Sequence, residues 1–377
     1  MTHSLKPDNL FFRKVKKLLS SPGLFFRDYL IQKYPLIFNE INCPVEQEKI
    51  LIRNDLNIER KIHIDFPVDV VFTWVNDSDP VWRKKFCDYK KSVSEGDKEY
   101  DCDPARYCNN NEIIFSVESV IRFMPWVRRV FIITDNQFPE ALNQYQKVKI
   151  IDHRDIIAEA LLPTFNSHVI EAHLHNIPGL AEHFIYFNDD VFVARPLLAS
   201  HFFKGNGHAA LFLADKSLAI MAQKGKNTPT LHASCKSVAL LKERYKQVID
   251  SPLVHTYVPL RKSMFTLAWD EYNDEIVKFI SSKFRSHNDL NLATFLVPWL
   301  AYIHGIATLQ RDSCYYFNIR SPAARTHYQA LLQAKNNNVS PHSFCANDFS
   351  STKSVMKNHK YLLEDFLKNY YGKEKYV

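Results

Sequence analysis

Glycine is scarce in this chain, at 8 of 377 residues. Neither common glycine-rich phosphate loop occurs, because no stretch reads G-x-G-x-x-G or G-x-x-x-x-G-K-[ST]. If the protein binds a nucleotide, groups other than a glycine cradle must hold the phosphates.

Cysteine is also sparse. The seven cysteines are odd in number, scattered along the chain and without a C-x-x-C pair. A disulfide scaffold and a structural zinc site are therefore not expected, and a reducing compartment suits the sequence better.

Long uninterrupted apolar runs are absent as well. The N-terminal sequence MTHSLKPDNLFFRKVKKLL lacks the apolar core and the small-residue cleavage site of a signal peptide. The most apolar long stretch, residues 293–309, is interrupted by Pro298 and His304, and it is predicted to be a buried helix rather than a membrane span. The protein is expected to be cytoplasmic.

The chain is rich in aromatic residues, at 13%, and carries a formal net charge of +7. In residues 11–26, phenylalanine and leucine recur at helical spacing beside four basic residues, Arg13, Lys14, Lys16 and Lys17. Such a helix can lie on an anionic membrane surface, peripheral on the inner membrane, or it can be a packing helix with a solvated basic face. No nucleic-acid partner is expected, because no matching motif accompanies the charge.

Strand-like and helical patterns alternate from about residue 66. Strand-like runs occupy residues 68–75, 129–134 and 148–151, and residues 111–126 have helical periodicity that Pro125 ends. This alternation predicts an α/β fold with a Rossmann-like, largely parallel mixed sheet flanked by helices.

Four polar turns directly follow strand-like runs: NDSDP at 76–80, TDNQ at 134–137, DHRD at 152–155 and NDD at 188–190. A pair such as Asp189 and Asp190 in FIYFNDDVFV is also common in simple turns between strands. The carboxyl ends of parallel strands, however, gather ligand-binding groups at one edge of the sheet. Four acidic turns at such an edge favour a cation site, and oxygen ligands suit Mg²⁺ or Mn²⁺.

Candidate bases lie in residues 164–180, which contain His168, Glu171, His173 and His175. Their spacing is not that of a zinc hydrolase. Two interpretations remain open: the histidines are structural partners of the acidic turns, or one imidazole is a general base.

Two arginines in apolar surroundings, Arg261 and Arg285, are candidate phosphate ligands. The guanidinium fork matches phosphate oxygens, although a single arginine is more often a salt-bridge partner.

Five segments in order resemble the conserved regions of the Stealth family: DVVFTWVNDSDPVW, ARYCNNNEIIFSVESVIRFMPWVRRVFIITDNQFP, LPTFNSHVIEAHLHNIPGLAEHFIYFNDDVFVARPL, FRSHNDL and FCAND. The family contains bacterial capsular polysaccharide phosphotransferases and the catalytic subunit of the animal N-acetylglucosamine-1-phosphotransferase. The resemblance covers about residues 68–350.

The resemblance implies a glycosyltransferase-A-like core that moves a hexose- or N-acetylhexosamine-1-phosphate from a UDP-sugar donor to a hydroxyl of a growing capsular polysaccharide acceptor. The products would be a phosphodiester and UMP, and the expected partners are the inner face of the membrane and the capsule assembly machinery.

The same resemblance implies the site. Asp189 and Asp190 would hold Mg²⁺ or Mn²⁺, Asp79 would be a catalytic residue in the nucleotide and metal site, and the nucleotide would lie beside Asn76, Asp77, Asn347 and Asp348. His173 would deprotonate the acceptor hydroxyl, and Arg285, with Arg261, would stabilise the phosphoryl charge. Asn76, Ile114 and Glu118 depart from residues common in the family, which leaves sugar and acceptor preference open.

The predicted organisation is a basic helical segment over residues 1–65, a catalytic domain over 66–350 and a tail over 351–377. Two alternatives to the phosphotransferase remain. One is a metal-dependent glycosyltransferase that releases UDP, and the other is a non-enzymatic polysaccharide- or membrane-binding protein.

Overall fold

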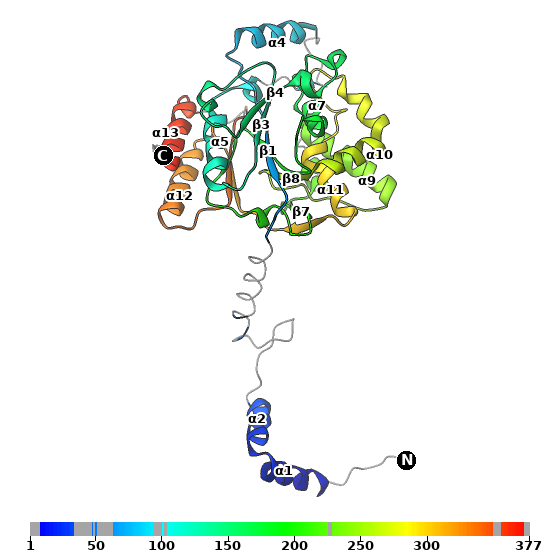
Figure 1. The fold of residues 1–377 in the computed structure, drawn as a ribbon, viewed down its shortest axis with the longest axis vertical. Coiled ribbons are helices and arrows are strands. Elements are labelled where there is room, and N and C mark those ends of the chain that lie inside the picture. The colour runs from blue at the N-terminus through cyan, green and yellow to red at the C-terminus, as the bar shows by residue number, and fades with distance from the viewer. Residues whose placement is uncertain are drawn as a thin grey trace. The chain divides into compact units, whose positions relative to one another are not determined.

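The computed structural model describes residues 8–33, 47, 50, 63–92, 100–101, 104–224, 228–349 and 356–372 (Figure 1). The chain divides into two compact units, Met1–His63 and Ile64–Val377. Within the described residues, no helix is both long and apolar enough to cross a membrane.

The first unit contains two described helices, α1 (Asp8–Ser20) and α2 (Pro22–Lys33). An ion pair between Lys17 and Asp28 joins them. Lys14 and Lys16 are exposed, and so are several large apolar side chains: Leu19, Leu24, Phe26, Tyr29 and Leu30. The side chains of Phe11 and Arg13 lie outside the described part of the chain.

The second unit is built on a five-stranded sheet with the order β4 (Val148–Asp152), β3 (Val130–Thr134), β1 (Val68–Thr73), β5 (His183–Asn188) and β8 (Val258–Arg261). The first four strands are parallel, and β8 runs antiparallel to β5. The predicted α/β fold with a mixed, largely parallel sheet is therefore confirmed.

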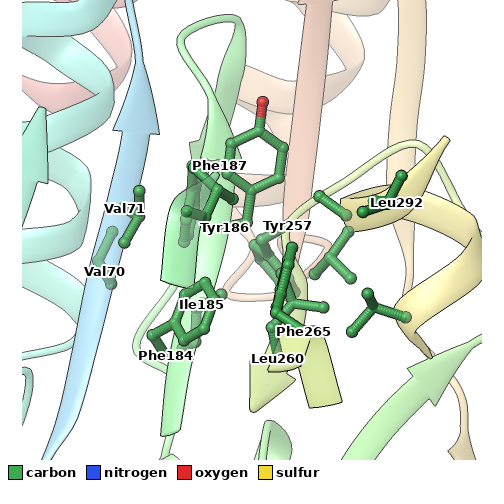
Figure 2. Close-up of a cluster of buried hydrophobic side chains, with 14 of the residues drawn as sticks. Val70, Val71, Phe184, Ile185, Tyr186, Phe187, Tyr257, Leu260, Phe265 and Leu292 are labelled. Atoms are coloured by element: carbon green, nitrogen blue, oxygen red, sulfur yellow. The ribbon is translucent and has the colours of Figure 1, made fainter. Parts of the chain in front are cut away.

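The central strands β1, β3 and β5 are almost entirely buried and mostly apolar, because both faces of the sheet are covered. Figure 2 shows side chains of β1, β5 and β8, among them Val71, Ile185 and Leu260, in one cluster with Phe265 and Leu292 from the helical layer. One exception is Asp69 in β1, which is fully buried. Its carboxylate accepts hydrogen bonds from Arg128 Nε at 2.9 Å and from the amide of Ala181 at 2.8 Å, which offset the cost of burying the charge.

Helices lie on both sides of the sheet (Figure 1). One side has α5 (Glu112–Phe123), and the other has α7 (Ser167–Ala172), α9 (Pro229–Tyr245), α10 (Lys262–Ile280) and α11 (Val297–Ile303). The stretch predicted to be a buried helix begins as a π-helical turn at Leu292–Leu296, continues as α11, and is followed by strand β10 (Ala307–Gln310).

A second, three-stranded sheet has the order β11 (Cys314–Asn318), β12 (Ser343–Asn347) and β6 (Val191–Val193). Helices α12 (Ala324–Asn336) and α13 (His359–Tyr371) share a separate aromatic core with it, which includes Phe192, Phe344, Tyr328, Phe366 and Tyr370. Strand β5 belongs to the first sheet and β6 to the second, so the turn at Asp189 and Asp190 connects the two sheets.

Smaller elements complete the unit. They are α4 (Pro80–Ser92), α6 (His153–Ile156), α8 (Leu218–Gln223), the parallel pair β7 (Ala209–Phe212) and β10, and the antiparallel pair β2 (Tyr100–Asp101) and β9 (Arg285–Ser286). Short 3₁₀ turns occur at Pro104–Tyr107, Glu140–Leu142, Glu159–Leu161, Leu174–Asn176 and Ala199–His201.

Candidate active site

The four acidic turns follow β1, β3, β4 and β5, at one edge of the parallel sheet. Two of them have structural partners. Asp135 forms an ion pair with Lys85 at 2.7 Å, and Asp152 forms a capping box at the start of α6. The turns after β1 and β5 are therefore the stronger candidates for a ligand site.

In the turn after β1, Asp79 caps helix α4. Its Oδ1 accepts hydrogen bonds from the amides of Val81 at 2.7 Å and Trp82 at 3.1 Å, which would otherwise be unsatisfied at the helix start. The structure thus gives Asp79 a structural task at the site that the sequence predicted for the nucleotide.

The turn after β5 places Asp189 and Asp190 near Glu112, the first residue of α5. Burial raises the pKa of Glu112 to about 7. Hydrogen bonds from Asn110 act to lower this pKa, and the charge of Asp190 acts to raise it further. Burial, followed by the charges of Glu112 and Asp190, raises the pKa of Asp189 well above its usual range. Three carboxyl groups at one place repel one another as anions, and a bound cation would relieve that repulsion.

Asp190 has one oxygen with partners and one without. Its Oδ2 accepts hydrogen bonds from Asn347 Nδ2 at 2.8 Å and Cys345 Sγ at 3.3 Å. Its Oδ1 is buried and has no hydrogen-bond partner among the described residues. An orphaned carboxylate oxygen in an acidic cluster fits Mg²⁺ or Mn²⁺, both of which prefer oxygen ligands.

His255 also lies at this place, in the segment that leads into β8. Ligand atoms of Asp190, His255 and Cys345 all lie within 4.8 Å of one another. The His255 ring contacts Tyr316 edge-on, with centroids 5.1 Å apart. His255 is exposed at this edge of the sheet.

Glu171 on α7 is the third acidic feature of the site. It is buried, and its Oε1 accepts a hydrogen bond from Tyr186 Oη at 3.3 Å. That hydroxyl also lies 3.0 Å from Asn188 Oδ1 and 2.9 Å from Thr73 Oγ1, so Glu171 is linked to the ends of β5 and β1. Glu171 Oε2 is buried without a partner among the described residues.

Arg285 in β9 completes the group. Its Nε lies 3.1 Å from Ser167 Oγ, and its Nη1 lies 3.5 Å from Thr230 Oγ1. Its charge acts on both Tyr186 and His255, which places it on the same side as Glu171 and Asp190. Arg285 donates hydrogen bonds to the neutral hydroxyls of Ser167 and Thr230, which leave its charge able to bind an anion.

The structure does not bring His173 into this group. Its Nδ1 lies 2.7 Å from the carbonyl oxygen of Val169, and its ring contacts Trp269 on α10 with centroids 5.3 Å apart. Burial lowers the pKa of His173. These contacts place the imidazole within the helical layer.

Arg261 lies at the opposite end of the sheet. In the register of β5 and β8 it pairs with His183, the first residue of β5, whereas Asp189 follows the last. Arg261 Nε is 3.0 Å from Glu182 Oε1. Arg261 is therefore a salt-bridge partner of Glu182, which is the alternative that the sequence left open.

The remaining predicted residues lie around the edge of the site. Asn76 exchanges hydrogen bonds with Gln137, and Asp77 Oδ1 accepts one from the amide of Asn109 at 3.1 Å. Asp348 is paired with Arg320, and the charges of both Asp77 and Asp348 act on Lys360. Asn347 is the member of this set that contacts Asp190 directly.

The sequence predicts no specific role for Glu171, and Glu112, His255 and Cys345 are not among the site residues that it predicts. The polar turns that the sequence marks all follow strands, whereas His255 precedes the strand VPLR, so the same pattern does not mark it. Nothing in the sequence alone pairs residue 255 with residue 190.

Comparison with known proteins identifies the class. Residues 66–92 match conserved region 1 of the Stealth proteins, and residues 106–211 match conserved region 2. The capsular polysaccharide phosphotransferase LcbA of Aeromonas hydrophila is 55% identical over 361 residues, which is 96% of this chain and 99% of that protein. LcbA of Neisseria meningitidis is 52% identical, over 95% and 99% of the two chains.

The chain therefore belongs to the Stealth family, and it is a transferase. A more distant relative, the exopolysaccharide phosphotransferase SCO2592 of Streptomyces coelicolor, is 30% identical over 82% of this chain and 32% of its own. Among solved structures, the galactosyltransferase LgtC with donor and acceptor sugar analogues is similar with a TM-score of 0.39 and 10% identity, over 82% of this chain and 97% of that one.

Proposed function

We propose that this protein is a capsular polysaccharide phosphotransferase that moves a sugar 1-phosphate from a UDP-sugar to a sugar hydroxyl. The acceptor oxygen attacks the β-phosphorus, the bond from that phosphorus to the bridging oxygen breaks, and UMP leaves. The product is a phosphodiester within the polymer. The names of the relatives, at about half identity over nearly the whole chain, support the class of reaction.

The observation that carries the proposal is the cluster of Asp190, His255 and Cys345 at the carboxyl edge of the sheet, whose ligand atoms lie within 4.8 Å of one another. We assign the base role to His255 rather than to His173. The Nδ1 of His173 is already bonded to a backbone carbonyl in the helical layer, whereas His255 lies beside the acidic cluster. His255 would take the proton of the acceptor hydroxyl as the new bond forms.

Arg285 and Glu171 have complementary roles in this proposal. The guanidinium, held by two hydroxyls, would bind the oxygens of the transferred phosphoryl group. Glu171 Oε2 would accept a hydrogen bond from the acceptor sugar and orient it.

Asp189 and Asp190 would hold Mg²⁺ or Mn²⁺, with the orphaned Oδ1 of Asp190 as one ligand. When bound, such an ion would neutralise charge on the diphosphate. Asn76, Asp77 and Asp348 remain candidates for contacts with the nucleotide, and Asp79 would act there through helix α4.

We further propose that the first unit attaches the protein to the inner face of the membrane, near the capsule assembly machinery. Exposed lysines on α1 and exposed Leu19, Phe26 and Leu30 form the combination that binds anionic lipid surfaces.

The decisive experiment identifies the leaving group. Given UDP-N-acetylglucosamine, Mg²⁺ or Mn²⁺ and a capsule oligosaccharide, the protein should release UMP, and the ³¹P spectrum of the product should show a phosphodiester. A glycosyltransferase attacks the anomeric carbon instead and expels UDP. Release of UDP, with no phosphorus in the polymer, would overturn the phosphotransferase assignment.

A further inference from the structure

Three consecutive residues, His255 to Tyr257, are hydrogen-bonded to the second sheet or to Asp312, which lies just before β11. The Cys314 thiol lies 3.4 Å from the His255 carbonyl oxygen, and Thr256 Oγ1 lies 2.7 Å from Ser343 Oγ. Tyr257 Oη donates a hydrogen bond to Asp312 Oδ1 at 2.8 Å. The position of His255 therefore depends on contacts that its own side chain does not make.

Asp312 is the residue on which these contacts converge. Its side chain is fully buried. Besides the contact with Tyr257, Asp312 Oδ1 lies 2.9 Å from His201 Nε2, and Asp312 Oδ2 accepts a hydrogen bond from Ser343 Oγ at 3.4 Å. Ser343 thus connects Thr256 to the same carboxylate. Two of the three contacts that hold residues 255–257, those of Thr256 and Tyr257, therefore end at Asp312, and we call these two contacts the tethers. A buried carboxylate is costly unless it is paired in this way.

Two histidines enclose Asp312. The rings of His201 and His342 stack with centroids 4.5 Å apart and an interplanar angle of 19°. His342 Nδ1 accepts a hydrogen bond from the amide of Ser313 at 3.0 Å and lies 3.4 Å from Asp312 Oδ1.

Ligand atoms of His201, Asp312 and His342 lie within 4.8 Å of one another, a spacing that a metal site would also have. Each of these groups, however, already has a hydrogen-bond partner in the protein. The network is complete without an ion, which favours a structural task.

We propose that Asp312 is a positioning residue for the transfer reaction. It holds residues 255–257 through Tyr257 and through the Ser343–Thr256 link, so that the His255 imidazole stays beside Asp190. This inference rests on the assignment of His255 as the base. The substrate would meet His255 but not Asp312, so Asp312 acts on the turnover step rather than on donor binding.

Conservative variants of the tethers test the proposal without removing the buried charge. Thr256→Val keeps the shape of the side chain but loses the hydroxyl, and Tyr257→Phe loses only the phenolic oxygen. Each should lower kcat about 10-fold or more while the donor KM changes less than about 3-fold, because a small displacement of a catalytic group costs rate. Because the two tethers share Asp312, the double variant should lose less than the product of the two single losses.

Two matched controls accompany these variants. Thr256→Ser retains the hydroxyl and should restore most of the kcat that Thr256→Val loses. Tyr272→Phe removes a hydroxyl that is buried in α10 without a partner among the described residues, and it should leave kcat unchanged. Melting temperatures of all variants separate a change in rate from loss of folded protein.

Three outcomes would overturn the proposal: wild-type kcat in both Thr256→Val and Tyr257→Phe, equal losses in Thr256→Ser and Thr256→Val, or one bound metal ion per chain that His342→Ala abolishes. His255→Gln separates this inference from the proposed function. Wild-type kcat in His255→Gln removes the base assignment itself. An inactive His255→Gln with fully active tether variants removes only the positioning role.

Discussion

Asp189 and Asp190 are adjacent in the sequence, but their carboxyl groups have different surroundings. Burial and two neighbouring carboxyl groups raise the pKa of Asp189, which favours its neutral form when no cation is present. Asp190 instead accepts hydrogen bonds from Asn347 and Cys345 through one oxygen and leaves the other without a partner. The unpartnered oxygen makes Asp190 the better single site for a test of the cation.

Asp190→Asn should lower kcat/KM by about 10²–10³-fold, because the amide keeps the hydrogen-bonding shape but removes the charge that holds the cation. The measurement is the initial rate at increasing Mg²⁺ and Mn²⁺, with thermal unfolding to show that the protein is folded. Asp365→Asn, an exposed change on α13 with the same loss of charge, is the control. Near wild-type rates for Asp190→Asn at saturating metal would mean that Asp190 is not a ligand.

At the scale of elements, the sequence predicted the strands and their polar ends well. The runs at 68–75 and 129–134 correspond to β1 and β3, which need long apolar runs because both of their faces are covered. The run at 148–151 corresponds to β4 at the edge of the sheet, which is less buried. The common edge of the four acidic turns was also predicted, because it follows from parallel pairing alone.

The partners of those turns could not be predicted in the same way. Asp190 meets Cys345 and Asn347 because β12 pairs with β6, which is a contact between residues more than 150 positions apart. The direction of β8 in the sheet could not be predicted from the sequence either. Its antiparallel pairing puts His255, just before the strand, near the site and carries Arg261 to the far end. Histidines that are close in the sequence, such as His168, His173 and His175, can be recognised as a cluster from the sequence alone, whereas the pairing of β8 with β5 cannot.

Helix α6 gives a prediction for the pH dependence of stability. His153, its first residue, is buried, and burial lowers its pKa to about 4 although Asp135 and Asp152 oppose the shift. Between pH 6.5 and 4, the unfolded chain binds a proton at His153 that the folded protein does not bind. This histidine therefore makes the free energy of unfolding fall as the pH falls, by about 2 kcal/mol at pH 5.

His153→Gln should remove that contribution. Urea unfolding at pH 5, 6, 7 and 8 would show a shallower loss of stability in the variant than in the wild type, with the two curves converging on a constant difference above pH 7. Parallel curves over the whole range would mean that His153 titrates alike in the folded and unfolded states.

At the scale of the whole molecule, the proposed attachment of the first unit to the membrane can be tested, since no helix among the described residues is long and apolar enough to cross a membrane. The first unit carries exposed lysines and exposed apolar side chains, among them Leu19 at 80% and Phe26 at 55%. Each lysine near an anionic surface contributes about 1 kcal/mol to binding. Neutralising two of them should therefore weaken the attachment measurably and leave the chemistry of the second unit intact.

The double variant Lys14→Gln/Lys16→Gln in the full chain should bind vesicles that contain phosphatidylglycerol about 30-fold more weakly than the wild type. Its kcat on a soluble oligosaccharide should not change. The control Lys84→Gln/Lys242→Gln removes the same charge from exposed positions on α4 and α9, and it should bind almost as the wild type does. Equal weakening in both double variants would indicate a general charge effect, and vesicle binding that is insensitive to both the α1 lysines and added salt would exclude α1 as the attachment site.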